Sequence, residues 1–354
     1  MDEDARFAAA ELRLAATQLL GAAGLPQAMA ATVADVLLEA DLMGHTTHGL
    51  ALLPDYLGEL DRGGMAKSGE PTIVATAPAA TVWDGNRLPG PWLVKRAVEH
   101  AVERAAETGS HAVTVRRSHH IACLAAYLKP VTDRGLMIVL ASSDPNTASV
   151  APFGGTVRLI TPNPLAAGIP TGGDPILIDV SMSTTTNAMT ARARTTGQRL
   201  PQEWILDAQG RPTSDPEAFF ADPPGSILPL GGTELGYKGF ALGLLIEALT
   251  GGLAGHGRAD PGEGWGASFF LQIHDPARFA GRAAFERQMA ALAAAARTCP
   301  PAPGHERVRL PGQRALARRA SQLAQGVALD PSILPRLRPW AERYAVPLPS
   351  GWRE

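Results

Sequence analysis

The sequence has few cysteines, no excess charge of either sign and no motif for binding a polyanion. Its 354 residues include only two cysteines, Cys123 and Cys299, which excludes a disulfide framework, and their spacing suits no zinc motif. This usage favours a reducing compartment. The 32 Lys and Arg residues against 34 Asp and Glu leave a net charge of -2, which argues against nucleic acid as the main partner.

The sequence also lacks a long uninterrupted apolar run. Its most apolar stretch, "GFALGLLIEALTGGLAG", is interrupted by Glu247 and is too broken to span a bilayer. The N-terminus opens with acidic residues, the wrong sign for a secretory signal. We therefore expect a cytoplasmic protein without a membrane partner, and its 45% hydrophobic content is enough for a large core.

A glycine-rich dinucleotide fingerprint is absent as well. No G-x-G-x-x-G follows an expected strand and opens a helix, and the approximate match "GLAGHG" closes one. If the chain binds a dinucleotide, it does so without a Rossmann phosphate turn.

Apolar periodicity predicts an α/β protein. Residues 5 to about 63 have helical spacing, with Thr47 placed to cap the second part of this region. Further helices are expected at 90–108, where Gly109 ends the pattern, at 121–135, at 234–255 as a long buried helix, and from about 281 onward. Strands are expected at 71–86, 111–118, 136–144, 157–183 and 268–275. We expect residues 1–75 and about 281–354 to form one helical domain, packed against a central α/β domain of residues 76–280.

Two histidines in "GHTTHG" are the first candidates for chemistry. His48 follows Thr47 at an expected helix N-terminus, where the helix dipole disfavours the imidazolium ion. A neutral imidazole suits general acid–base catalysis, whereas local capping or packing is an equally good explanation of this stretch alone. His45 is expected to be structural or to support His48.

A second pair, His119 and His120, lies in "SHHIAC". At a strand end their side chains point to opposite faces, so at most one of them faces a given pocket. No H-E-x-x-H or comparable cluster accompanies them, and we predict no metal ligands.

Two further segments suit an anionic ligand. The hydroxyl-rich "IDVSMSTTTN" follows a strand, and hydroxyls with exposed amides can bind phosphate. "RLPGQRALARR" places Pro-Gly before a helix that carries Arg314 and Arg318, which favours an anion site. An ordinary polar loop and a solvated basic helix face explain the same two patterns.

In combination these segments resemble the malate/L-lactate dehydrogenase-like family of NAD(P)-dependent oxidoreductases, which is unrelated to the Rossmann-type enzymes. The resemblance spans roughly residues 5 to 330. It is carried in order by "GHTTHG", "SHHIA", "VAPFGG", "NPLAAGIP", "IDVSMS", "LGYKGFAL" and "RLPGQ". It implies a non-Rossmann fold with a largely antiparallel central sheet, NAD or NADP bound in the central domain near a homodimer interface, and hydride transfer to or from a small 2-hydroxy or 2-keto acid or a related carbonyl or imine compound.

The resemblance also assigns roles to residues. His48 matches the histidine usually given proton transfer and His120 the second active-site histidine, so which of them transfers the proton stays open; Thr47 would orient His48. The segments expected to contact the dinucleotide are Ile178, Asp179, Val180, Ser181, Met182, Ser183, Thr184, Tyr237, Lys238, Gly312, Gln313, Arg314 and Arg318. Tyr56, Arg117 and Ser143 are expected to contact the substrate.

One departure bears on the substrate. Family members usually carry an arginine four residues after the first histidine, and this chain has Leu52 there. Either Arg116, Arg117 or another residue replaces that anchor for a carboxylate, or the substrate is not a simple 2-hydroxy acid. Two other classes remain open: a metal-dependent hydrolase using His45, His48, His119 and His120, and a non-catalytic binding homologue.

Overall fold

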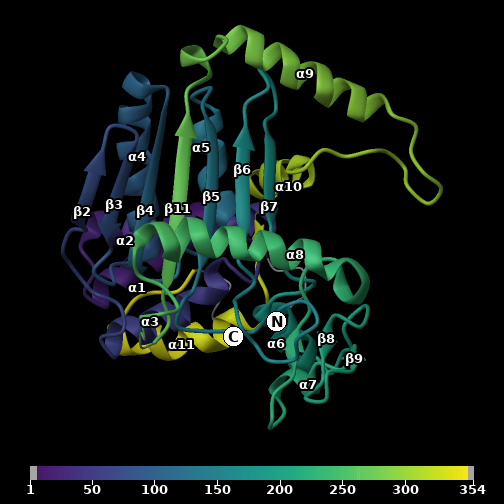
Figure 1. Cartoon of the computed structure of the whole chain (residues 1–354). Coiled ribbons are helices and arrows are strands. Elements are labelled where there is room, and N and C mark those ends of the chain that lie inside the picture. The colour runs from purple at the N-terminus through teal and green to yellow at the C-terminus, as the bar shows by residue number, and fades with distance from the viewer. Residues whose placement is uncertain (1–5, 261, 263, 350–354) are drawn as a thin grey trace.

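A seven-stranded sheet with the order β2-β3-β4-β11-β5-β6-β7 forms the centre of the protein (Figure 1). The structure is a computed structural model that describes residues 6–260, 262 and 264–349. The strands of this sheet are β2 (Thr72–Ala77), β3 (Ala80–Asp84), β4 (Ser110–Ser118), β5 (Met137–Ser143), β6 (Leu165–Ile169), β7 (Ile176–Val180) and β11 (Ala267–His274). All neighbours are antiparallel except β3 and β4. The expected non-Rossmann α/β fold with a largely antiparallel sheet is therefore confirmed.

The parallel pair depends on helix α4 (Gly90–Thr108), which provides the crossover from β3 to β4. Its apolar residues recur on one face, and it ends where predicted because Gly109 adopts a positive φ of 78°. The next strand in the chain, β5, does not pair with β4. Strand β11, from much later in the sequence, lies between them and pairs with both.

The helix expected at 121–135 is shorter than predicted. Helical structure begins only at the 3₁₀ turn η2 (Leu124–Tyr127) and continues as α5 (Leu128–Thr132). Ala122 has a φ of +58°, and the Tyr127 hydroxyl donates a hydrogen bond to the Ile121 carbonyl at 2.6 Å. These features hold the segment after His120 out of helical geometry.

The N-terminal helices pack with helices from the C-terminal part. Helix α2 contacts α10, α3 contacts α11, and strand β1 pairs with β12. The elements are β1 (Arg6–Phe7), α1 (Ala9–Ala22), α2 (Gln27–Met43), the 3₁₀ turn η1 (Leu50–Leu52), α3 (Leu53–Asp61), α10 (Gln313–Gln325), β12 (Val327–Ala328) and α11 (Ile333–Tyr344). One apolar core joins these helices to the sheet. The division into two domains remains a prediction, and its outer ends, residues 1–5 and 350–354, lie outside the described residues.

Helix α8 (Gly232–Glu247) corrects one expectation, because it is not buried. It crosses in front of the sheet (Figure 1) and turns its glycines Gly236, Gly239 and Gly243 inward. Much of its apolar side faces outward, with Leu242 42% and Leu245 51% exposed. Glycines on the inner face let the helix approach Leu230 and Phe153 closely, and the leucines project away from the fold. The apolar run in the sequence therefore arises from leucines on an exposed face of α8 and not from a buried helix.

The remaining elements lie at the edges of the fold. A small sheet of β8 (Ile205–Leu206), β9 (Pro212–Thr213) and β10 (Ser226–Ile227) has its own apolar cluster. The other elements are α6 (Asn187–Thr195), α7 (Glu217–Phe220), the π-helical turn η3 (Ala248–Gly252), the 3₁₀ turn η4 (Pro276–Arg278) and α9 (Arg282–Thr298). Within the described residues, no helix combines the length and apolar character needed to cross a bilayer.

Candidate active site

His48 lies in a turn that Asp41 holds in place. Helix α2 ends at Gly44 in the left-handed conformation, and η1 begins at Leu50. The buried Asp41 carboxylate accepts a hydrogen bond from the Leu50 N–H at 2.7 Å. A Cβ at Gly49 would lie 2.4 Å from that carboxylate, so only glycine allows this approach. The turn is therefore fixed from within the protein.

Thr47 does not cap the following helix as expected. Its Oγ1 is 2.9 Å from His48 Nδ1, and Gly49 occupies the N-cap position of η1. Because Nδ1 is engaged by Thr47, the second nitrogen of His48, Nε2, is the one left for a ligand.

The His48 ring is held neutral mainly by burial. The pKa of His48 is lowered to about 4, mainly by burial of the ring and to a smaller extent by the neighbouring His45. The expected neutrality is thus found, but its cause is removal of the ring from water rather than a helix dipole.

His120 is fixed in one orientation by its neighbours. The Tyr56 hydroxyl lies 3.0 Å from His120 Nδ1 and donates to the His120 carbonyl, while the Ala122 N–H donates to Nδ1 at 3.3 Å. A nitrogen that accepts an amide proton carries none of its own, so the neutral ring has its proton on Nε2. The ring stacks on Trp265 at 4.5 Å, and burial holds the pKa of His120 well below its usual value.

The adjacent residues His119 and His120 face different surroundings. The His48 and His120 ring centroids are 6.0 Å apart, and both rings line one cavity. His119 instead packs edge-on against Tyr56 and Trp265, with Nε2 3.5 Å from the Glu59 carboxylate. Since the distance exceeds that of a good hydrogen bond, we read this as a buried contact. Burial lowers the pKa of His119 to about 3.

The cavity shared by His48 and His120 has a volume of about 420 Å³. Its polar lining includes His45, Thr47, Ser143, Asp144, Asp179 and Ser181. Its apolar lining includes Leu52, Ile121, Leu124, Pro162, Met189 and Trp265. Ser143, which was expected to contact the substrate, lines this cavity. Tyr56, also expected to contact the substrate, is not among its lining residues and instead holds His120 in place.

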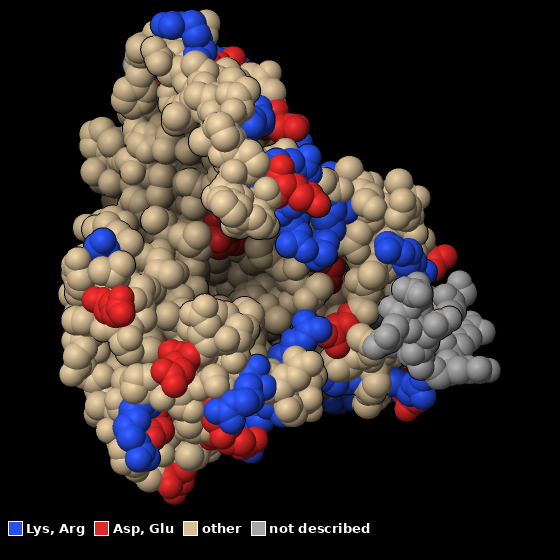
Figure 2. Space-filling view, turned by 90° about the vertical axis from the view of Figure 1, so that its right-hand side faces the viewer, with Lys and Arg blue, Asp and Glu red and all other residues tan. Residues whose placement is uncertain are grey.

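A second cavity of about 550 Å³ adjoins the first, and His45 and Asp179 line both. It is lined by Ile178, Asp179 and Val180 of β7, by Gly312 before α10, and by Arg309, Arg314 and Arg318. Figure 2, which views the side where β7 and α10 lie in Figure 1, shows a hollow with several Lys and Arg side chains, and some Asp and Glu, at its edge. The N-terminus of α10 and these arginines make this cavity suitable for phosphate groups.

Two glycines shape this second cavity. A Cβ at Gly44 would lie 2.5 Å from the Arg318 guanidinium, and a Cβ at Gly312 would lie 2.6 Å from Leu177 Cβ. Glycine at these positions lets Arg318 and the start of α10 lie directly against the turn after α2 and against β7. These two glycines thus position Arg318 and the start of α10, although the chain has no glycine-rich fingerprint.

Several expected cofactor residues line neither cavity. Met182 is buried, the Ser183 hydroxyl donates to the Thr185 carbonyl, and Thr184 donates to the carbonyls of Trp204 and Leu228. Gln313 accepts a bond from the Leu310 N–H. Tyr237 and Lys238 lie on α8, where Tyr237 is half exposed and contacts Phe153. The Ser183 and Thr184 hydroxyls are thus used by backbone carbonyls of the protein itself, a use that residue type alone does not reveal.

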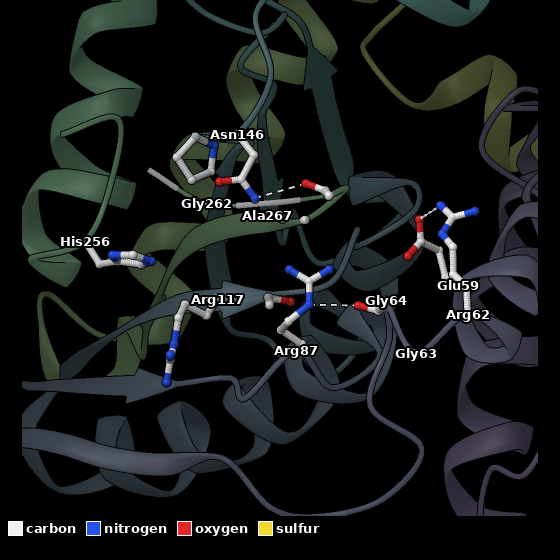
Figure 3. Close-up of a pocket in the computed structure, with 14 residues that line it drawn as sticks. Glu59, Arg62, Gly63, Gly64, Arg87, Arg117, Asn146, His256, Gly262 and Ala267 are labelled. Carbon is white, nitrogen blue, oxygen red and sulfur yellow. Dashed lines mark hydrogen bonds and ion pairs between the residues drawn. The ribbon is translucent and has the colours of Figure 1, made fainter. Parts of the chain in front are cut away.

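Arg117 does not line the cavity that His48 and His120 share. Asp84 accepts bonds from Arg116 Nε at 3.0 Å and from Arg117 Nε at 2.9 Å. Arg117 lines another cavity of about 590 Å³ with Arg62 and Arg87, and this cavity shares Gly266 and Ala267 with the one that His48 and His120 line. Figure 3 shows the Arg117 side chain extending away from Arg87. That Arg117 contacts the substrate stays a prediction.

Sequence reasoning missed Asp41 and Trp265. Asp41 is buried within a helical apolar pattern. Because a carboxylate at such a position is unusual, the sequence alone could have singled it out. Trp265 follows a glycine-rich loop, and nothing in the local sequence indicates that it stacks on His120.

Comparisons with known proteins agree with this geometry. The sequence profile of the family described as "Malate/L-lactate dehydrogenase" matches residues 7–338. The chain is 32% identical to L-lactate dehydrogenase from Cupriavidus necator, covering 96% of this chain and 98% of that protein. It is 31% identical to (2R)-3-sulfolactate dehydrogenase (NADP(+)) from Chromohalobacter salexigens (94% and 96% covered) and 30% identical to ureidoglycolate dehydrogenase (NAD(+)) from Escherichia coli O157:H7 (88% of each).

Solved structures show the same fold. Malate dehydrogenase from Entamoeba histolytica superposes with a TM-score of 0.91 at 22% identity, covering 98% of this chain and 99% of that one. Delta1-piperideine-2-carboxylate reductase from Pseudomonas syringae superposes with a TM-score of 0.81 at 26% identity, covering 95% of this chain and 100% of that one. The likeness extends over nearly the whole of each chain.

Proposed function

This chain belongs to the malate/L-lactate dehydrogenase family, and we propose that it is an NAD(P)-dependent oxidoreductase acting on a CH–OH or CH–NH group, with His48 as the proton-transfer residue. Relatives named for hydroxy acids and for a cyclic imino acid support both kinds of substrate. Relatives named for NAD(+) and for NADP(+) support either dinucleotide. The two free cysteines are consistent with the expected cytoplasmic setting.

One observation carries the proposal. The cavity with two neutral imidazoles adjoins the arginine-rich cavity at α10, and His45 and Asp179 line both. A dinucleotide needs such a pair of spaces, one for the nicotinamide and substrate and one for its phosphates. Arg309, Arg314, Arg318 and the α10 N-terminus provide positive charge for the phosphates.

The mechanism follows from the protonation of the two rings. When bound, the dinucleotide supplies or accepts the hydride. In the oxidative direction, neutral His48 accepts the hydroxyl proton at Nε2 while Thr47 holds Nδ1. His120 presents its Nε2–H as a hydrogen-bond donor to the substrate oxygen, and Tyr56 fixes that ring. In the reductive direction the proton returns from His48.

The lining of the cavity bears on substrate choice. Leu52 stands at the position where the family usually has an arginine, and it forms an apolar wall with Ile121 and Met189. Arg116 and Arg117 are held by Asp84 and do not line this cavity. We propose that the preferred substrate places an apolar group against Leu52, and that simple 2-keto acids bind weakly.

We also propose that the protein is a homodimer. The supporting observation is that four leucines of one helix, α8, are each 42–51% exposed: Leu235, Leu242, Leu244 and Leu245. Several exposed apolar side chains on one element are typical of a surface that binds another protein. A second copy of the chain is the partner we expect on this face.

Cofactor binding tests the proposal directly. Trp265 lines the catalytic cavity, so NADH or NADPH should quench intrinsic fluorescence, and the quenching should shrink in Trp265→Phe. A substrate screen that follows the absorbance of the reduced nicotinamide then identifies the reaction. If neither dinucleotide binds, the proposal fails; if one binds and no compound in a broad carbonyl and imine screen turns over, the non-catalytic homologue is supported instead.

The metal-dependent hydrolase is disfavoured by geometry. His119 packs away from the cavity that His48 and His120 line, so the four histidines do not converge on one point. The dehydrogenase and reductase relatives also give this alternative no support.

A further inference from the structure

Three side chains that are remote in sequence meet where the two cavities adjoin. His45 comes from the turn after α2, Cys123 from the segment before η2, and Asp179 from β7. One ligand atom of each, an imidazole nitrogen, the Sγ and a carboxylate oxygen, lies within 4.8 Å of the others. The Cys123 Sγ is 3.7 Å from Asp179 Oδ2.

This cluster is largely withdrawn from water. Cys123 is only 3% exposed. The Asp179 carboxylate accepts a hydrogen bond from the Ala125 N–H at 2.9 Å. Among the ion pairs of the described residues, none joins Asp179 to a lysine or arginine. A buried carboxylate beside a thiol is a site where a cation is stabilising.

We propose that His45, Cys123 and Asp179 bind a divalent ion of the zinc class, with the fourth position open to the catalytic cavity. Sulfur, imidazole and carboxylate are the donors that Zn²⁺ takes in proteins, at about 2.0–2.3 Å. Tetrahedral geometry with such bonds separates donor atoms by about 3.3–3.8 Å. The sulfur–oxygen distance of 3.7 Å already meets this requirement. All three donor atoms lie within 4.8 Å of one another, so a rotation of the half-buried His45 side chain would complete the ligand set.

The sequence predicted no metal ligands because residues 45, 123 and 179 form no recognisable spacing. Only the folded chain brings them together. An ion can reach the three side chains through the cavities, because all three line the catalytic cavity and two of them, His45 and Asp179, also line the α10 cavity.

The position of the proposed ion predicts that zinc inhibits dinucleotide binding. An ion held by residues shared between the two cavities would block the passage that the dinucleotide occupies, so zinc and the dinucleotide should exclude each other. This consequence rests on the proposed function, whereas metal binding itself does not.

Cobalt titration tests the site without relying on activity. Chelator-treated protein should bind Co²⁺ and show a thiolate-to-cobalt charge-transfer band in the near ultraviolet. Cys123→Ser should abolish the band. Cys299→Ser is the control, because it alters the other cysteine, which is exposed, and it should retain the band. His45→Gln keeps the thiolate and should weaken cobalt binding at least about 10-fold, as losing even supporting metal contacts does.

Two results would overturn the proposal: a wild-type protein without the band at saturating cobalt, or a band that survives in Cys123→Ser. Thermal unfolding of each variant without metal checks that it is folded. Zinc is then titrated against NADH quenching. If the band is present and NADH does not bind, the site stands and the proposed function fails; if the band is absent and NADH quenches normally, the function stands and the site fails.

Discussion

At the scale of single residues, the site depends on two imidazoles that the fold keeps neutral. Thr47 occupies Nδ1 of His48, and Tyr56 and Ala122 occupy the same atom of His120, so both rings direct Nε2 to a ligand. Burial lowers the pKa of each ring. The residue types were visible in the sequence, but their protonation depends on neighbours that only folding supplies.

His48→Ala should lower kcat by ~10²–10⁴-fold, the usual contribution of a positioned acid–base group, and leave dinucleotide affinity nearly unchanged. Steady-state kinetics and NADH quenching measure the two effects separately. His305→Ala, at an exposed histidine, is the matched control and should behave as wild type. A large loss of NADH affinity with normal turnover of the bound complex would remove His48 from catalysis.

Leu52→Arg should raise kcat/KM for pyruvate or oxaloacetate by about 10-fold or more, because a charged hydrogen bond to a carboxylate contributes roughly 1.5–3 kcal/mol. Leu52→Met keeps an apolar side chain of similar volume and should not change this preference. The comparison of kcat/KM across keto acids and uncharged carbonyl compounds gives the result. Efficient reduction of pyruvate by the wild-type protein would contradict the assignment of Leu52.

At the scale of elements, the turn between α2 and η1 is the feature on which the site depends. Asp41 accepts the Leu50 N–H, and Gln322 of α10 donates to the carbonyls of Asp41 and Leu42. A helix from the C-terminal part thus fastens the turn that carries Thr47 and His48. The sequence indicated a helical region here, but neither where α2 ends nor what holds the turn that follows.

Asp41 should make stability depend on pH. Burial raises the pKa of Asp41 from 3.8 to about 7. The folded protein therefore binds this proton more tightly than the unfolded chain, and stability falls as pH rises between about 4 and 7. Three pKa units correspond to at most about 4 kcal/mol. Asp41→Asn keeps an oxygen that accepts the Leu50 N–H and should remove this dependence.

Urea unfolding of both proteins at the two ends of this pH range provides the measurement. The free energy of unfolding of Asp41→Asn should exceed that of wild type most at the alkaline end. Buried His48 shifts stability with the opposite sign, since its pKa is lowered, but it is common to both proteins and cancels in the difference. Equal pH dependence in the two would show that Asp41 ionises as readily in the folded state as in the unfolded one.

At the scale of the whole molecule, α8 lies across the sheet with an apolar face turned outward (Figure 1). No residue of α8 is among those that line the catalytic cavity or the α10 cavity. The apolar face and the ligand cavities are therefore distinct features of the surface. We expect the first to bind a second copy of the chain and the second to bind the dinucleotide.

Leu242→Glu combined with Leu245→Glu should convert the dimer to monomers, because two carboxylates cannot be buried against an apolar partner without a large desolvation penalty. Sedimentation velocity measures the change in mass. Leu292→Glu on α9 is a control, since that leucine is 61% exposed and lies on a different helix. A wild-type protein that sediments as a monomer at all concentrations would refute the dimer.

The sequence by itself determined the local features of this protein. Periodicity predicted a helical region around α2 and the helix α4 with its end at Gly109, alternation predicted β4, and an apolar run predicted β5. The ordered segments around His48, His120 and Gly312 indicated the family. Each of these predictions depends on residues close together in the chain. Only the tertiary structure decided the rest. It placed β11 between β4 and β5, turned α8 outward, drew Arg117 to Asp84, and brought His45, Cys123 and Asp179 together. These outcomes depend on packing and charge pairing between segments far apart in sequence, which no local pattern encodes.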